Sequence, residues 1–257
     1  MEQRSLGRHI WGILSPMVIY MAVSLAIQIG ALALSVSVYE YATEITAVSA
    51  LCALPILCLL FYRDRKRNPE TEGKKAPWQR YGLLILFSVP FVLELNNLLM
   101  VSGLMYVSET YQETATLLYM PSFPVQILCI GVIVPIAEEL IFRGLIYRRL
   151  RETWPVFPAM LVSALLFGIY HGNIVQGVYG AVAGLALSFI YEAYGSLKAP
   201  VLTHMVMNIT SCVATEYQGF EWIFAEIGRF LAVTAVCLAL TVAAGIWIYR
   251  SYKMFTK

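Results

Sequence analysis

The sequence has few charged residues. Only 13% of its 257 residues are Asp, Glu, Lys or Arg, whereas 59% are hydrophobic; soluble proteins carry about 25% charged residues. A soluble domain of this length could not cover its surface with so few charges, so the composition excludes a typical cytosolic enzyme and a disordered chain. The net charge of +2 is too small to attract a polyanion, and we expect no nucleic-acid partner.

Paired cysteines and internal repeats are also missing. The five cysteines lie in apolar stretches, form no CxxC pair and are odd in number, which excludes a complete disulfide framework. No two-fold repeat of the kind common in transporters is visible along the chain.

Long apolar runs are abundant instead. A helix needs about 20 apolar residues to cross a bilayer. Eight candidate runs cover residues 10–38, 45–62, 81–103, 125–147, 156–171, 174–194, 200–214 and 222–249, of which the fifth and seventh are short. The first is too long for a signal peptide, so we interpret it as a retained anchor. We predict an all-α, multi-pass membrane protein with about eight transmembrane helices in one integral-membrane domain, 1–257, located in the cell membrane if the source is bacterial.

The distribution of positive charge predicts an orientation. With the N-terminus inside, the basic loops between spans two and three (63–80), after span four, before span seven and after span eight all fall on the cytoplasmic side. The opposite loops contain acidic residues and neither Lys nor Arg: Glu40, Glu44, Glu109, Glu113, Glu216 and Glu221. We therefore predict that both termini are cytoplasmic. The 63–80 loop is interpreted as a topology signal lying on anionic lipid.

Ionisable groups inside a bilayer are costly and tend to mark function. Span four contains Glu138, Glu139 and Arg143. Glu139 and Arg143 are i and i+4, so they can pair on one helix face. Glu138 has Phe142 at i+4, so it lacks this partner and is suited to acid or base catalysis. The alternative is a buried ion pair that only locks helices together.

Two further spans contribute histidines. Phe167 and His171 share a face at the end of span five, and His204 and Asn208 share a face of span seven. Either pair alone could be structural hydrogen bonding between helices. With a rise of 1.5 Å per residue, Glu138, His171 and His204 can converge at mid-depth or in the half of the membrane nearest the basic loops.

Other polar positions have structural interpretations. Glu94, Asn96 and Asn97 in span three favour hydrogen bonding, and Glu226 can pair with Arg229 near the outer interface. The small residues Gly177, Gly180 and Gly184 in span six indicate close helix packing.

Together, the patterns Glu-Glu-x-x-x-Arg, Phe-x-x-x-His and His-x-x-x-Asn resemble the CPBP family, which comprises CAAX prenyl proteases of the Rce type and bacteriocin-processing (Abi) proteins. The motifs run from Glu138 to Asn208 within an expected catalytic core at 123–214. The resemblance implies an intramembrane protease that hydrolyses a peptide bond of a membrane-associated peptide or protein.

The resemblance also implies roles for the site residues. Glu138 and His171 would activate the attacking water, and His204 and Asn208 would stabilise the oxyanion. Glu139, Arg143 and Phe167 would support the site. We favour a metal-free mechanism because no HExxH motif is present; the alternative is a zinc ion held by Glu138, His171 and His204.

The sequence leaves two other classes of function open. One is a non-catalytic membrane scaffold or bacteriocin self-immunity protein. The other is a proton-coupled transporter that uses the buried Glu and His as a relay. The substrate is also open: it could be CAAX-type, a pheromone or leader peptide, or a bacteriocin-related peptide.

Overall fold

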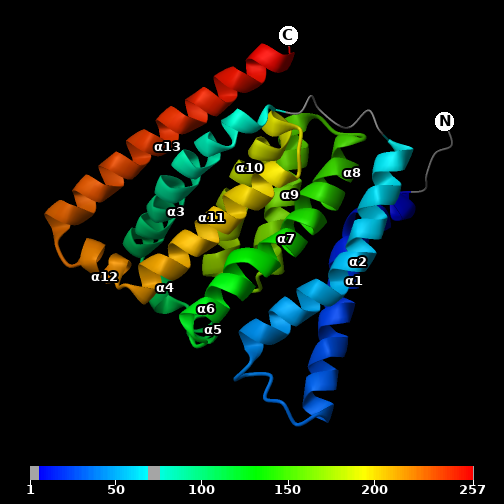
Figure 1. Cartoon of the computed structure of the whole chain (residues 1–257), viewed down its shortest axis with the longest axis horizontal. Coiled ribbons are helices and arrows are strands. Elements are labelled where there is room, and N and C mark those ends of the chain that lie inside the picture. Colours follow the sequence, from blue (N-terminus) through cyan, green and yellow to red (C-terminus); the bar gives the residue numbers. More distant parts are fainter. Residues whose placement is uncertain (1–5, 69–75, 257) are drawn as a thin grey trace.

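The computed structural model of the protein describes residues 6–68 and 76–256. Within these ranges the chain forms a bundle of helices and no strand (Figure 1). Six segments are long and apolar enough to cross a membrane: Ile10–Ala33, Ala42–Arg67, Trp78–Ser102, Phe123–Arg151, Ile174–Tyr194 and Ile227–Tyr252. The protein therefore has the all-α, polytopic membrane fold expected from its composition.

The helices are named in chain order. They are α1 (Leu6–Ala33), α2 (Ala42–Arg67), η2 (Trp78–Arg80), α3 (Gly82–Ser102), α4 (Leu104–Val107), α5 (Glu109–Tyr119), α6 (Phe123–Gln126), η3 (Ile127–Ile133), α7 (Val134–Glu139), η4 (Leu140–Tyr147), α8 (Arg148–Arg151), α9 (Val156–Tyr170), α10 (Ile174–Tyr194), α11 (Lys198–Glu216), α12 (Gly219–Phe224) and α13 (Ile227–Thr256). The segments α6 to α8 are consecutive and form the Phe123–Arg151 span.

Each of the eight predicted runs corresponds to a helix, but several boundaries differ; the first helix, for example, ends at Ala33. The two short runs are α9, with 15 residues, and α11, with 19 residues; these are not among the six candidate spans. The predicted start of the last span is wrong, because α12 is a separate helix and α13 begins at Ile227. The second helix continues to Arg67, so it includes the first part of the predicted 63–80 loop; residues 69–75 of that loop lie outside the described residues.

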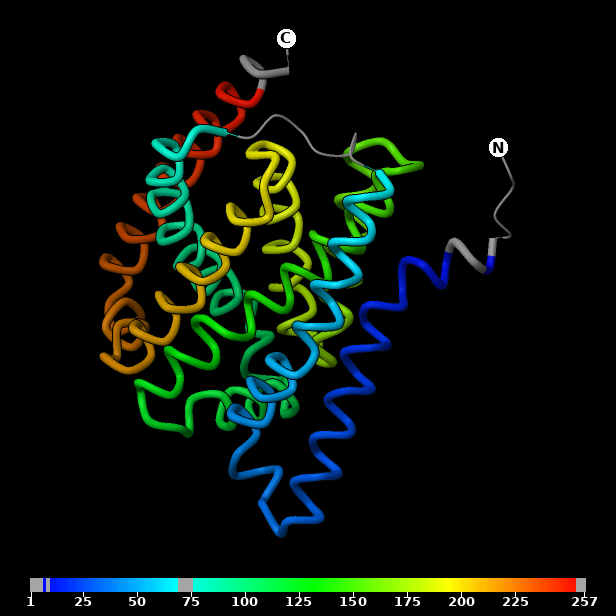
Figure 2. The backbone as a smooth tube through the Cα atoms, turned by 45° about the vertical axis from the view of Figure 1, so that its right-hand side comes forward, coloured from blue at the N-terminus to red at the C-terminus, as the bar shows by residue number. Residues whose placement is uncertain are grey.

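The bundle has a buried centre and two lipid-facing edges. The α1–α2 hairpin forms one edge and α3 with α13 the other, with α7, α9, α10 and α11 between them (Figures 1 and 2). Only 11% of the most apolar window of α1 and 17% of that of α13 is buried, against 56% for the Phe123–Arg151 span. The Phe123–Arg151 span is therefore the central helix, and apolar side chains on the outer helices are available to lipid.

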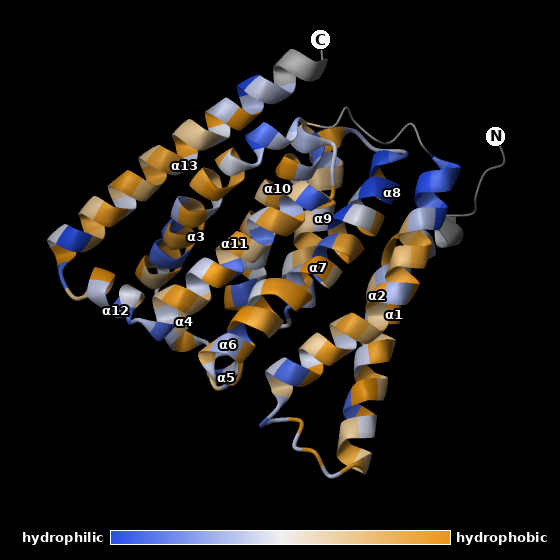
Figure 3. Cartoon of the chain, in the orientation of Figure 1, coloured by the Kyte–Doolittle hydropathy of each residue, from blue (hydrophilic) through white to orange (hydrophobic). Residues whose placement is uncertain are grey.

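Hydrophilic residues gather at the end of the bundle where α2 ends and α8 lies (Figure 3). Several of these charges also join helices. Arg149 pairs with Asp64 of α2 at 2.6 Å, and Arg151 pairs with Glu192 of α10 at 3.3 Å. We call this the basic end and the opposite one, which carries Glu40, Glu109 and Glu221, the acidic end.

Candidate active site

The central helix is irregular on both sides of the two glutamates. The segments η3 and η4 are π-helical, and α7, which ends with Glu138 and Glu139, lies between them. Such π segments are rare and often occur at functional sites. Pro135 has no N–H, so it cannot donate to the carbonyl of Ile130, its i−5 acceptor in a π-helix. Asn208 of α11 donates its amide to that carbonyl instead, at 2.9 Å.

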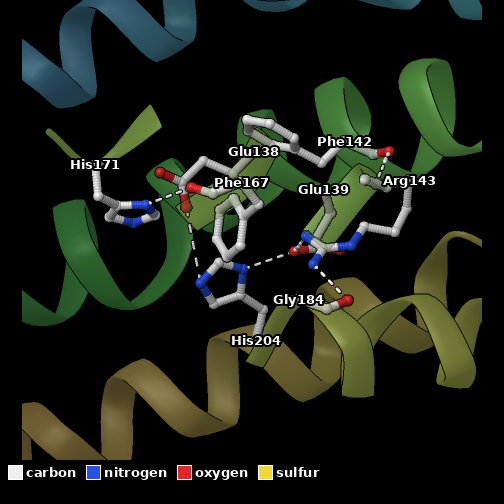
Figure 4. Close-up of polar contacts among 9 residues, drawn as sticks. Glu138, Glu139, Phe142, Arg143, Phe167, His171, Gly184 and His204 are labelled. Atoms are coloured by element: carbon white, nitrogen blue, oxygen red, sulfur yellow. Dashed lines mark hydrogen bonds and ion pairs between the residues drawn. The ribbon is translucent and has the colours of Figure 1, made fainter. Parts of the chain in front are cut away.

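Glu139 lies at the centre of a buried polar cluster. Its Oε1 accepts a hydrogen bond from Arg143 Nη1 at 2.7 Å and is 2.8 Å from His204 Nδ1. Arg143 also donates to the carbonyl of Gly184 on α10 at 3.1 Å. Glu139 and Arg143 are both fully buried, so the pair expected from their i, i+4 spacing also connects α7 to α10 and α11 (Figure 4).

Glu138 faces a different environment. Its Oε2 is 3.7 Å from His204 Nε2, and no other ion pair of Glu138 occurs among the described residues. The side chain is 8% exposed and lines a cavity. His204 therefore lies between the two carboxylates, with Nδ1 toward Glu139 and Nε2 toward Glu138 (Figure 4).

A tight turn places His171 at the end of α9. Gly172 has a φ of +75°, which favours glycine, and Asn173 caps α10 by accepting a hydrogen bond from the Gln176 N–H at 2.9 Å. His171 Nδ1 is 2.8 Å from the Phe167 carbonyl. A carbonyl only accepts, so Nδ1 carries the hydrogen and, in the neutral ring, Nε2 has a free lone pair.

Phe167 packs among the polar residues. Its ring lies 4.7 Å from the Arg143 guanidinium and makes edge contacts with the rings of His171 at 4.8 Å and His204 at 5.8 Å. An aromatic face stabilises a desolvated cation. Phe167 thus supports the buried arginine and both imidazoles at once.

The four residues expected to do chemistry line one cavity of about 340 Å³. They are Glu138, His171, His204 and Asn208. The cavity is also lined by residues that the motifs did not indicate, namely Tyr111, Thr114, Ala115, Leu118 and Tyr119 of α5, with Tyr170, Gln176 and Tyr179. Burial raises the pKa of Tyr111 and of Tyr119, so these phenols stay protonated and can donate hydrogen bonds.

Small residues allow the surrounding helices to approach closely. A Cβ on Gly168 would lie 2.4 Å from the carbonyl oxygen of Gly177, and one on Gly184 would lie 2.9 Å from Ala164 Cα. The glycines of α10 therefore pack against α9, as their spacing indicated. This crossing places Gly180 beside the His171 ring, because a Cβ there would be 3.4 Å from Nδ1.

Most of the remaining polar positions lie apart from the cavity. Glu226 and Arg229 form an exposed pair at 3.1 Å. Asn97 donates to Thr234 of α13 at 2.9 Å, and Glu94 is buried in α3 and is not part of the cavity lining. Of the span-three group, Asn96 does line the cavity.

Comparisons with known proteins indicate a membrane peptidase. The family described as Type II CAAX prenyl endopeptidase Rce1-like matches residues 120–210, which include all three motifs. A curated relative, "Putative membrane peptidase YdiL" of Bacillus subtilis (strain 168), is 26% identical over 174 residues, or 65% of this chain and 70% of the relative. No solved structure matches the chain significantly. The chain is a multi-pass membrane protease whose motif-bearing region is similar to the Rce1-like family.

Proposed function

We propose that this protease is an endopeptidase whose water nucleophile is activated by Glu138 and His171, with His204 and Asn208 stabilising the oxyanion. The observation that carries the proposal is that these four side chains, from three helices, line one cavity. Glu139, Arg143 and Phe167 hold the catalytic side chains in position. The substrate is a membrane-associated peptide or protein, consistent with the family match.

The base chemistry follows from the hydrogen bonds. With Nδ1–H donated to the Phe167 carbonyl, the neutral His171 ring offers Nε2 as an acceptor for a water proton. Glu138 is a second acceptor lining the same cavity. Water that loses a proton to this pair attacks the scissile carbonyl, and the proton is later delivered to the leaving amine.

The oxyanion chemistry follows from the partners of His204 and Asn208. Glu139 accepts from His204 Nδ1–H, so a second proton on Nε2 gives a cationic ring flanked by two carboxylates, with Nε2–H as a donor. Asn208 uses one amide hydrogen on the Ile130 carbonyl and has a second to donate. Two such donors stabilise a tetrahedral oxyanion by several kcal/mol each.

Zinc is the alternative catalyst, and its fit depends on the donor set. In the part of the chain that the structure describes, no three His, Cys, Asp or Glu side chains are grouped closely enough to hold a metal ion. The proposed mechanism therefore uses Glu138, His171 and His204 without a metal. Chelation of purified protein tests this: activity that is lost and then restored only by zinc would overturn the metal-free mechanism.

Membrane peptidomics of cells expressing the wild type and Glu138→Ala tests the activity and identifies substrates together. Peptides cleaved only by the wild type are the expected result. An inserted, folded Glu138→Ala protein that retains full biological activity would favour a scaffold or immunity role instead. Proton-coupled flux in liposomes that the same substitution abolishes would favour a transporter.

A further inference from the structure

The cavity is asymmetric along the helices that form it. On the central helix, its lining residues are Ile130, Val134 and Glu138, and none of residues 139–151 contributes. On α11 the lining residue nearest the basic end is His204, six residues after the helix starts. Both helices thus line the cavity only between the acidic end and the depth of Glu138 and His204.

The other helices show the same limit. The parts of α9 and α10 that line the cavity are Phe167 to His171 and Val175 to Ala183, where the α9–α10 turn lies at the acidic end. The helix α2 contributes Thr43 and Thr46 near its start, and α3 contributes only Asn96 and Leu99 near its end. Every helix therefore contributes the part that lies toward the acidic end.

In the opposite direction, the described part of the central helix is closely packed. Beyond Glu138 and Glu139, every side chain of η4 is buried. Six of them are fully buried: Ile141, Phe142, Arg143, Leu145, Ile146 and Tyr147. The Glu139–Arg143 ion pair and its bond to Gly184 lie in this packed layer and are not part of the cavity lining. A peptide that approached Glu138 along this part of the central helix would have to displace these buried side chains.

At the acidic end, the short helix α5 lies across the cavity. Its lining residues include Tyr111, Thr114 and Tyr119, and it is held by two hydrogen bonds to its carbonyls, from Thr43 to Leu117 and from Gln126 to Tyr119. Its other face is exposed, with Gln112 and Glu113 outward. The cavity is thus separated from solvent on this side by one short helix.

We infer that substrate enters from the acidic end, which the positive-inside rule places outside the cytoplasm. The peptide bond that is cut therefore belongs to an exported peptide or to the extracytoplasmic segment of a membrane protein, and not to the C-terminus of a cytosolic lipidated protein. The inference rests on the proposed function and names the substrate class for that site.

Single cysteines test the direction of entry. In a variant whose five native cysteines are Ala, Glu113→Cys marks the acidic end, Thr114→Cys marks the cavity and Arg67→Cys marks the basic end. A membrane-impermeant maleimide applied to intact bacterial cells should label the first two, and Arg67→Cys only after permeabilisation. Labelled Thr114→Cys should lose cleavage of the peptides found by peptidomics, whereas labelled Glu113→Cys should retain it.

The opposite pattern would overturn the inference: Arg67→Cys labelled in intact cells, with the other two protected. Retained cleavage after complete labelling of Thr114→Cys would also overturn it, because the cavity would not be the entry route. So would wild-type-specific cleavage sites in cytoplasmic tails. If the wild type and Glu138→Ala yield the same peptides, the proposed function fails, while the labelling still decides which way the cavity opens.

Discussion

The two halves of the central helix differ although both are apolar in sequence. From Ile127 to Glu138 the helix borders a cavity, and from Glu139 to Tyr147 it is packed on all sides. Adjacent glutamates mark the boundary. Glu138 borders the open half, and Glu139 is fully buried with two nitrogen partners.

This difference separates reactivity from support. A buried carboxylate whose charge is matched by an arginine and a histidine stabilises the structure and has little freedom to exchange a proton with substrate. A carboxylate at a cavity wall has room for water beside it. One helix therefore provides a reactive group on a rigid base, as precise positioning of a catalytic group requires.

Glu138→Gln should have the largest effect on activity and little on stability. The amide keeps the shape of the side chain but cannot accept the water proton, so we expect cleavage to fall about 10²–10⁴-fold. The midpoint of thermal unfolding in detergent should stay near the wild-type value. Glu139→Gln is the matched control and should lower that midpoint, since it leaves Arg143 without its partner carboxylate. Equal midpoints of thermal unfolding for the two variants would contradict the view that Glu139 supports the structure and Glu138 does not.

Arg143→Leu should destabilise the packed half. Removing one member of a buried ion pair leaves the other charge uncompensated, at a cost of about 3–5 kcal/mol. The free energy of unfolding in denaturant titrations measures this. Arg151→Leu, which breaks a partly exposed pair with Glu192, is the control and should cost only about 0–1 kcal/mol. Similar losses for both variants would contradict the assigned difference in burial.

Asn208→Ala should lower the rate of the chemical step. Loss of one oxyanion donor typically reduces kcat about 10²–10³-fold, and kcat should fall more than KM changes. Ser211→Ala, one turn along α11 and also in the cavity lining, serves as the control. If Ser211→Ala reduces kcat as strongly, Asn208 has no special role.

Gly168→Ala should have the smallest of these effects. Its Cβ would meet the Gly177 carbonyl at 2.4 Å, and overpacking of this kind costs about 1–3 kcal/mol. Gly177→Ala places its Cβ 3.7 Å from the Gly168 oxygen, an ordinary contact, and should be near neutral. Thermal midpoints of the two variants compare them directly, and a larger loss for Gly177→Ala would show that the crossing is packed differently.

The sequence predicted the features that depend on local spacing. Long apolar runs located the helices, and i, i+4 spacing predicted that Glu139 and Arg143 pair and that Phe167 and His171 share a face. The depth estimate was less informative. It allowed the site to lie in the half nearest the basic loops, whereas the cavity extends from Glu138 and His204 the other way.

Contacts between distant segments could not be predicted. The partner of His204 is Glu139, 65 residues away, and hydropathy carries no signal for such a pair. Helix α5 is too short and polar to resemble a span, so its contribution to the cavity was missed. Tyr20 of α1 was also missed, because its contact with Tyr170, with ring centroids 5.9 Å apart, joins segments far apart in the sequence.

The π segments of the central helix have a consequence for insertions and deletions. A π turn accommodates about one more residue than an α turn, and each residue of an α-helix rotates the chain by about 100°. Deleting one residue from Ile127–Ile133 could convert that segment to ordinary α-helix and still leave a span of sufficient length. The two glutamates would then point in different directions relative to the preceding turns, so the protein could keep its topology and hydropathy profile and lose its catalytic centre.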